Sequence, residues 1–547
     1  MSNKSGWSFL TVQAFTVALL IALPIFSIVG SLLVGGTNEV WRHLVDTVLT
    51  EYVATTLMLC LGVSVGVILV GVPTAWLVSM TDFPGRRLFE WALILPLAVP
   101  AYVMAYTYTD LLQFVGPVQT WMREGLGIKP SQFRLPDIRT SGGALLMFIF
   151  VFYPYVYLLA RAAFLERASS MVEVGRSLGL GPWRSFYRIS LPMARPAIVA
   201  GTSLALMETL ADYGAVSYFG VQTFTTGIYR AWFSFGDRVA AAQLSAVLLA
   251  FVAVVVVLER FSRGRARFHV TGAQRRNTPP QRLHGLRALG AVLVCALPLT
   301  LGLLIPVGTL LHMSFTGGDA QFGARFVQLG RNSFVLALGT AVAAVAISLL
   351  LAYAVRASRH LLPRVVTRIV GLGYALPGSV IAVGVLIPVT RLDTWLGVAI
   401  AELTGRHPGL LLTGGIAALV YAYLVRFLTV SLQAVEAGLT KVKPSMDDAA
   451  RSLGYGHGAT LWKIHLPLVR GSLLTAGLLV FVDVMKELPA TLVMRPFNFD
   501  TLATQAYMLA SDERLIEAAT PALTIVAVGL LPLLLISRQI ARDRHSK

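Results

Sequence analysis

The sequence predicts an all-α integral membrane protein with about twelve transmembrane helices. Of its 547 residues, 56% are hydrophobic and only 13% are charged, and its mean hydropathy is +0.71. A soluble protein of this length carries about 25% charged residues. About twelve apolar runs are long enough to cross a bilayer as helices. The basic residues lie mainly in the short segments between these runs, which is typical of a multi-pass membrane protein.

The apolar runs form two sets along the chain, separated by a polar, Arg-rich linker at 263–286. We therefore expect a first half at 1–262 and a second half at 287–547, each with about six spans. The expected spans of the first half are about 9–34, 52–80, 88–116, 141–165, 194–220 and 239–259. Those of the second half are about 287–314, 332–355, 365–390, 409–435, 470–496 and 514–537.

The two halves are an internal repeat. Adding 275 to a position in the first half gives its partner in the second, so that "EVGRSLGLGPWRSFYRISLP" at 173–192 matches "DAARSLGYGHGATLWKIHLP" at 448–467. Because each half has an even number of spans, both halves insert in the same orientation. The sequence therefore predicts two parallel, pseudo-symmetric halves with a path between them.

The distribution of Lys and Arg sets the expected topology. The linker and the segments on its side of the membrane hold most of them, with Arg426 assigned to a helix end, so both termini are expected in the cytoplasm. The net charge of +18 would favour nucleic-acid binding in a soluble protein. Here the excess of Lys and Arg in cytoplasmic segments explains the charge. The lipid bilayer is an expected partner, and a nucleic acid is not.

The matched stretches at 173–192 and 448–467 lie on the cytoplasmic side in this topology. Each has an acidic residue, then "RSLG", then an amphipathic turn that ends in Leu-Pro. The glycine allows a sharp reversal that other residues resist. Two matched copies favour a docking element over an ordinary amphipathic surface helix. Its candidate residues are Glu173, Arg176, Gly179 and Pro192 in the first copy, and Asp448, Arg451, Gly454 and Pro467 in the second.

These stretches resemble the EAA loop of ATP-binding-cassette (ABC) importer permeases. Glu173 and Gly179 match that motif in the first half, and Asp448-Ala449-Ala450 with Gly454 matches it in the second. Val174-Gly175 departs from the Ala-Ala of the family by a mild change. The resemblance implies the type I ABC importer permease fold, with two copies of a cytoplasmic ABC ATPase seated on the two loops.

The chain also resembles a subgroup of that family, the iron(III) permeases that work with a periplasmic ferric-ion-binding protein. The stretches most like it include "LPLAVPAYVMAY" (95–106), "ETLADYGAVSYFG" (208–220) and "KELPATLVMRPFNFDTLAT" (486–504). The resemblance implies ferric iron as cargo and the bacterial inner membrane as location. Fused thiamine and phosphonate permeases share the two-half layout and remain alternatives.

The chain is expected to be a transport subunit and not an enzyme. It contains no GxxxxGK[ST] motif, so it has no P-loop for nucleotide. We expect no cofactor on this chain, and ATP with Mg²⁺ on the ATPase subunits.

Charged residues in the fifth span of each half are the candidate translocation path. Glu208 and Asp212 align with Asp483 and Glu487, and each pair is spaced i, i+4 on one helix face. Oxygen ligands suit hard cations, so these four carboxylates are candidate transient contacts for a metal ion. Lys486 is the cationic member of the candidate path.

Two interpretations of these carboxylates stay open. They contact a cation in the path, or they have a structural or gating role, in which Lys486 neutralises Asp483 and the carboxylates near the outer end cap helices. A helix-weakening residue follows each pair, Gly214 in the first half and Pro489 in the second. We expect a kink or gate at this level in both halves.

A different class of protein, a secondary transporter driven by an ion gradient, would use the same carboxylates as proton relays. The paired loops favour the ATP-driven importer, since a secondary transporter needs no ATPase dock.

Overall fold

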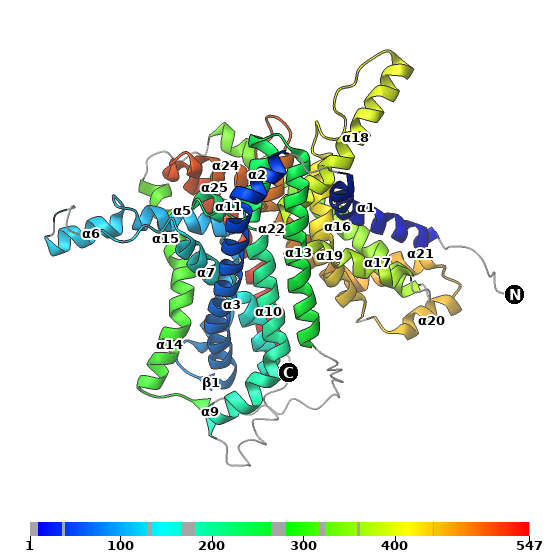
Figure 1. Cartoon of the computed structure of the whole chain (residues 1–547). Coiled ribbons are helices and arrows are strands. Elements are labelled where there is room, and N and C mark those ends of the chain that lie inside the picture. The colour runs from blue at the N-terminus through cyan, green and yellow to red at the C-terminus, as the bar shows by residue number, and fades with distance from the viewer. Residues whose placement is uncertain are drawn as a thin grey trace. The chain divides into compact units, whose positions relative to one another are not determined.

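The computed structural model describes residues 9–34, 39–127, 129, 134–165, 181–263, 281–316, 323–357, 362–440 and 442–545 (Figure 1). These residues form helices joined by short connections. Two strands of two residues each, β1 (Thr81–Asp82) and β2 (Gln281–Arg282), pair in parallel within them. The predicted all-α class is confirmed. Most of the linker at 263–286 lies outside the described residues.

The number of membrane spans agrees with the prediction of about twelve. Within the described residues, eleven helices are long and apolar enough to cross a membrane, or up to twelve if one bent pair counts as a single span. These helices also leave many large apolar side chains exposed, as expected of surfaces that face lipid.

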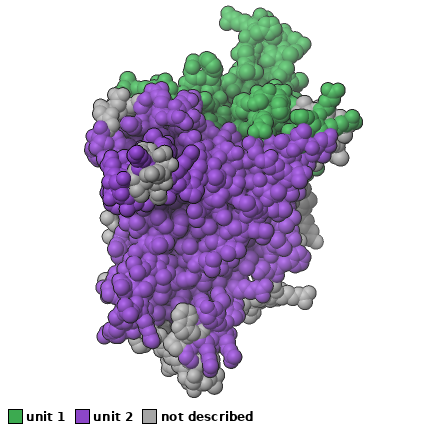
Figure 2. Space-filling model, turned by 60° about the vertical axis from the view of Figure 1, so that its left-hand side comes forward, with its two compact units in different colours: residues 1–44, 227–249, 321–505 green, residues 45–226, 250–320, 506–547 purple. Residues whose placement is uncertain are grey.

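The chain divides into two compact units, shown in green and purple in Figure 2. Unit 1 comprises 1–44, 227–249 and 321–505, and unit 2 comprises 45–226, 250–320 and 506–547. These units do not coincide with the two consecutive halves of the repeat. Among the described helices, four contribute residues to both units: α2 (Glu39–Thr47), α12 (Phe224–Tyr229), α13 (Arg238–Arg263) and α24 (Leu502–Ser511).

Unit 2 is built around three long helices from the first half, α3 (Leu49–Met80), α7 (Ser141–Ala163) and α10 (Leu191–Ala211), which pack against one another. Gly201 lets α10 approach the backbone of α7, because a Cβ at this position would lie 2.7 Å from the Cα of Val156. The other helices of the unit are α4 (Arg86–Ala92), η1 (Leu95–Ala98), α5 (Ala101–Leu112), α6 (Pro117–Leu126), α9 (Pro182–Ser185), η3 (Phe186–Ser190), α11 (Gly214–Tyr218), α14 (Leu286–Leu299), η5 (Thr300–Leu304), α15 (Ile305–Thr316) and α25 (Leu515–His545).

Unit 1 repeats this arrangement with the second half. Its three central helices, α16 (Ala324–Ala357), α19 (Ala417–Leu439) and α22 (Leu466–Met485), pack against one another and are the repeat partners of α3, α7 and α10. The other helices of the unit are α1 (Phe9–Val34), η4 (Arg230–Ser234), α17 (Leu362–Val370), η6 (Gly373–Ala375), α18 (Gly378–Thr404), α20 (Pro444–Ser452), α21 (His457–Thr460), η7 (Leu461–His465) and α23 (Pro489–Met494).

The first helix of each half packs in the unit that the other half dominates. In unit 1, α1 contacts α16, α17 and α18. A proline inside α1, Pro24, has no N–H, so the carbonyl of Leu20 four residues earlier lacks its helical donor. The hydroxyl of Tyr421, from α19, donates to this carbonyl. The side chain of one half therefore satisfies a backbone group of the other.

Unit 2 contains the same arrangement with the halves exchanged. There η5 and α15 contact α5 and α7. The π-helical turn η5 makes i→i+5 bonds, so Pro306 leaves the carbonyl of Leu301 without a donor. The hydroxyl of Tyr108, from α5, donates to Leu301 O at 2.6 Å. In a bilayer no water replaces such a bond. Each tyrosine therefore stabilises the packing of the first helix of one half against helices of the other half.

The third span of each half is not the single helix that the hydropathy predicts. The run 88–116 is broken, and its segments 86–98 and 101–126 are bent by 93°. The run 365–390 is also broken, since α17 ends at Val370 and α18 begins only at Gly378. The cause is the same in both halves, because Val99 and Leu376 each precede a proline and are held in an extended conformation.

The fifth span of each half ends earlier than predicted. The expected runs 194–220 and 470–496 stop as helices at Ala211 and Met485, and short helices α11 and α23 follow. We call the residues between them the first break (Asp212–Tyr213) and the second break (Lys486–Leu488).

The close approach of α1 to α18 gives a testable prediction. A Cβ at Gly384 would lie 2.6 Å from the carbonyl oxygen of Pro24, so Gly384→Ala must displace α1 and should lower stability by roughly 1–3 kcal/mol. Thermal unfolding of the purified protein in detergent measures this. The matched control is Gly397→Ala in the same helix, where the nearest atom is 3.9 Å away and alanine should be neutral or slightly stabilising. Equal unfolding temperatures for the two variants would contradict the packing.

Candidate functional site

The second EAA-like loop, residues 448–467, comprises most of a helix that begins at Pro444, a reversal and a second helical segment. The first helix is α20, and the second comprises α21 and η7 and runs directly into α22. Pro467 is the second residue of α22, directly after the π-helical turn η7. In the first half, Pro192 has the same place in α10. Glu173, Arg176 and Gly179 lie outside the described residues.

Gly454 makes the reversal, as the sequence predicts. Its φ is +79°, in the left-handed region that a side chain resists. The amide of Gly454 donates to the carbonyl of Arg451, and the amide of Tyr455 donates to that of Ala450, both at 3.0 Å. This pair of bonds is a Schellman motif, which satisfies the last carbonyls of α20 and turns the chain sharply.

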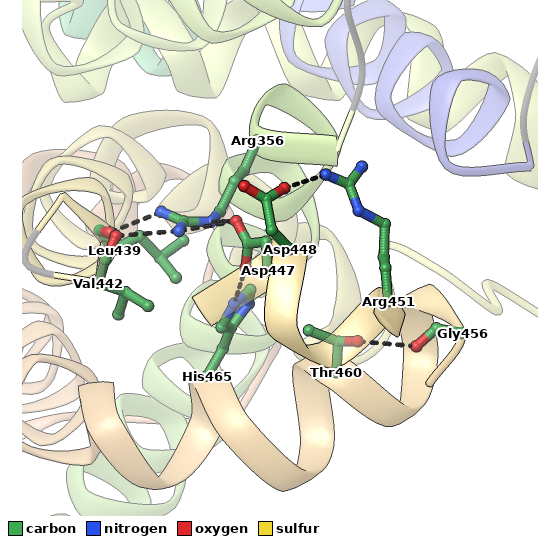
Figure 3. Close-up of polar contacts among 9 residues, drawn as sticks. All are labelled: Arg356, Leu439, Val442, Asp447, Asp448, Arg451, Gly456, Thr460 and His465. Atoms are coloured by element: carbon green, nitrogen blue, oxygen red, sulfur yellow. Dashed lines mark hydrogen bonds and ion pairs between the residues drawn. The ribbon is translucent and has the colours of Figure 1, made fainter. Parts of the chain in front are cut away.

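The two faces of α20 differ in exposure. Asp448 and Arg451 lie on its exposed face, where they form an ion pair (Figure 3). Ala450 is buried, with 1% of its surface exposed. Large apolar side chains are exposed on the same loop, including Leu453 at 75% and Trp462 at 70%. A loop with exposed charge and exposed apolar groups is typical of a protein–protein contact.

The first and second breaks are built in the same way. A carboxylate follows the end of the long helix, and it accepts from the second and third amides of the short helix that comes next. In the first break, Oδ1 of Asp212 accepts from the amides of Ala215 and Val216, at 3.0 and 3.1 Å. Gly214 and Pro489, the predicted kink residues, are the first residues of the short helices α11 and α23.

In the second break, Glu487 has this capping role. Its two side-chain oxygens accept from the amides of Ala490 and Thr491, at 2.9 and 3.1 Å. Oε1 also lies 3.4 Å from a guanidinium nitrogen of Arg426 on α19. Both side chains are buried, so the cation compensates a carboxylate that is shielded from water. Gly378 leaves space for this pair, because a Cβ there would lie 2.8 Å from Oε1.

Arg426 is a functional candidate that the sequence analysis placed wrongly. The hydropathy assigned it to a cytoplasmic helix end, but it lies in the middle of α19 and is 8% exposed. Its isolated position inside an apolar run was the signal, since a charge within a span generally pairs with another.

The remaining charges of the candidate path, like Asp212, are partly exposed, whereas Glu487 is buried. Asp483, in the last turn of α22, forms an ion pair with Lys486 at 3.0 Å, and both side chains are partly exposed. This is the neutralisation that the i, i+3 spacing suggests. Glu208, near the end of α10, is also partly exposed.

Within the described residues, no group of three or more His, Cys, Asp or Glu side chains could hold a metal ion. In each unit, one carboxylate of the predicted pair caps a helix and the other has a partly exposed side chain. The arrangement suits passing contacts better than a closed coordination site.

The family comparison identifies the class of protein. Residues 67–268 match a family described as "Binding-protein-dependent transport system inner membrane component". With the helical repeat and the EAA-like loops, this match supports an ABC importer permease with both halves fused in one chain.

Known permeases agree with this class. The chain is 26% identical over 536 residues to the Fe(3+)-transport system permease protein FbpB 2 of Haemophilus influenzae, which covers 97% of this chain and 98% of that protein. It is 26% identical over 202 residues to the sulfate transport system permease protein CysT of Escherichia coli, covering 37% of this chain and 70% of that protein. It is 28% identical over 206 residues to the molybdenum transport system permease protein ModB of Escherichia coli, covering 36% of this chain and 87% of that protein. The predicted resemblance to iron(III) permeases is confirmed, and sulfate and molybdenum permeases resemble parts of the chain as well.

The second break predicts unequal effects for two neighbouring carboxylates. Glu487→Ala leaves Arg426 buried without its carboxylate and removes the cap of α23, so stability should fall by roughly 3–5 kcal/mol. The control, Asp483→Ala, breaks a partly exposed pair and should cost less than about 1 kcal/mol. Thermal unfolding in detergent measures both. A larger loss for Asp483→Ala than for Glu487→Ala would contradict these roles.

Proposed function

We propose that this chain is the membrane-spanning subunit of an ATP-driven importer for ferric iron, and that a periplasmic binding protein delivers the iron. Two copies of a cytoplasmic ABC ATPase dock on the first EAA-like loop (173–192) and the second EAA-like loop. ATP and Mg²⁺ bind to those subunits and not to this chain. The protein lies in the bacterial inner membrane with both termini in the cytoplasm.

The conformation of the second EAA-like loop is the observation that best supports an ATPase partner. The loop reverses at Gly454 and exposes Asp448, Arg451 and large apolar side chains, which supports a docking role. A secondary transporter needs no such surface. Loss of uptake when the ATPase is omitted supports this class, and uptake that continues without it would exclude it.

Two observations support ferric iron as the cargo. The similarity to an Fe(3+) permease extends over 97% of the chain, while the sulfate and molybdenum permeases match little more than a third of it. In addition, "ETLADYG" at 208–214 has two carboxylates and no Lys or Arg, which favours a cation over an oxyanion. An oxyanion is the second candidate, because two of the relatives are named for sulfate and molybdenum.

Uptake by the reconstituted complex tests the cargo. Vesicles that contain the permease and ATPase would be supplied with ATP inside and with radiolabelled ferric iron or sulfate on its binding protein outside. ATP-dependent accumulation of iron alone supports the proposal. Accumulation of sulfate without iron would replace ferric iron with an oxyanion.

Gly454→Leu tests docking. A leucine in the left-handed region costs roughly 1–2 kcal/mol, so a loop that must keep this shape should bind the ATPase about 5- to 30-fold more weakly. Co-purification of the ATPase measures this. The control is Gly405→Leu, where a glycine with φ +67° ends α18 and a Cβ would meet no atom within 4 Å. Normal co-purification with Gly454→Leu, or equal loss with both, would contradict docking. Gly179→Leu should act like Gly454→Leu.

The double variant Glu208→Ala with Asp483→Ala tests the translocation path. A combined loss of roughly 1.4 kcal/mol of cation stabilisation would lower iron uptake about tenfold, with normal amounts of assembled complex. The control is Glu517→Ala, which breaks another i, i+3 pair, with Arg514. Wild-type uptake by the double variant would contradict a role in the path and leave both carboxylates with a structural role.

A further inference from the structure

Asp447, next to the EAA-like motif, joins the second EAA-like loop to the long helices (Figure 3). It lies on α20 beside the exposed Asp448, but its carboxylate turns to the other face. Oδ2 accepts from Nε of Arg356 at 2.9 Å and forms an ion pair with Nη2 at 2.8 Å. Oδ1 lies 2.6 Å from Nε2 of His465. Because a carboxylate only accepts, the imidazole donates this bond.

Arg356 extends the connection to a third helix. It lies in the last turn of α16, and its guanidinium also donates to the carbonyls of Leu439 and Val442, at 2.8 and 2.9 Å. These carbonyls lie at the end of α19 and just beyond it. Satisfying end carbonyls with a cation stabilises a helix C-terminus. One guanidinium therefore binds the end of α19 and the carboxylate of α20.

His465 completes the connection at α22. It is the last residue of η7, directly before α22, and is 1% exposed. Its ring packs edge-to-face on Tyr353 of α16, with centroids 5.5 Å apart. Asp447 thus lies between the ends of α16, α19 and α22, which are the three central helices of unit 1. Each bond to it is charge-assisted, and such bonds are about twice as strong as neutral ones.

The first half has no such group in its sequence. Subtracting 275 places Val172 at the position of Asp447 and Ser190 at that of His465. Around the partner position of Arg356, the sequence Ser79-Met80-Thr81 has no basic residue. In the sequence, this set of residues is therefore specific to the second half.

We propose that Asp447 is a positioning residue that makes the second EAA-like loop move as one body with α16, α19 and α22. The inference depends on the proposed function, in which an ATPase docks on this loop. A displacement of the loop by the ATPase is then passed directly to the three helices. The partner positions in the first half carry no charged or imidazole side chain, so we expect the two ATPases to be coupled unequally to the two halves.

The test separates docking from coupling. The full chain, its ATPase and the iron-loaded binding protein are reconstituted in lipid nanodiscs, and ATP hydrolysis is measured with and without the binding protein. Asp447→Asn should keep the co-purifying ATPase at the wild-type amount but lower the stimulation by the binding protein about five- to tenfold. Arg356→Gln should do the same, and the double variant should lose no more than either single one, because both act through one contact.

Two further variants distinguish a specific loss of coupling from a general loss of folding. His465→Gln keeps a donor for Asp447 and should retain most of the stimulation. Asp393→Asn is the matched control: this buried carboxylate of unit 1 accepts four bonds from Leu411, Leu412 and Thr413, far from α20 in the chain, and its loss should leave stimulation unchanged.

Several results would overturn the proposal. Normal stimulation in Asp447→Asn would show that the contact does not transmit movement. Loss of ATPase co-purification in parallel with stimulation, or an equal loss in Asp393→Asn, would show a role in folding alone. Absence of ATPase binding by the wild-type chain would instead refute the proposed function.

Discussion

The structure depends on one constraint: a backbone polar group inside a bilayer must find its partner within the protein. The sequence interrupts its spans with prolines and charged breaks, and each interruption frees such groups. The carbonyl that Pro24 leaves without a helical donor accepts a bond from the hydroxyl of Tyr421. The amides at the start of α23 donate to the carboxylate of Glu487. Because these partners come from other helices or from the adjoining break, satisfying the backbone also fixes how the helices pack.

This constraint explains why the charges in the fifth spans are unequal. Asp212 and Glu487 are needed by the helices that follow them, and Glu487 is further compensated by Arg426. Asp483 and Glu208 cap no helix start in this way and keep partly exposed side chains. In each half, one carboxylate of the pair therefore caps the start of the next short helix.

Asymmetry within the repeat concerns both the path and the loop. Lys486 has Ala211 as its partner in the first half, and Asp447 has Val172. A repeated protein can bring two ATPases to equivalent loops and still respond to them differently. The differences lie at the points where a cation or an ATPase is proposed to act, while the packing of the three central helices is kept in both units.

The sequence by itself determined the all-α class, the approximate number of spans, the repeat and the reversal at Gly454, because hydropathy, periodicity and glycine conformation are local properties. It also placed the carboxylates of the breaks at matching positions. Only the tertiary structure decided that Glu487 pairs with Arg426, that the first helix of each half packs with the other half, and that Asp447 and Arg356 together join three helix ends. These contacts connect residues tens to hundreds of positions apart, and no local pattern specifies which of the apolar helices lie side by side.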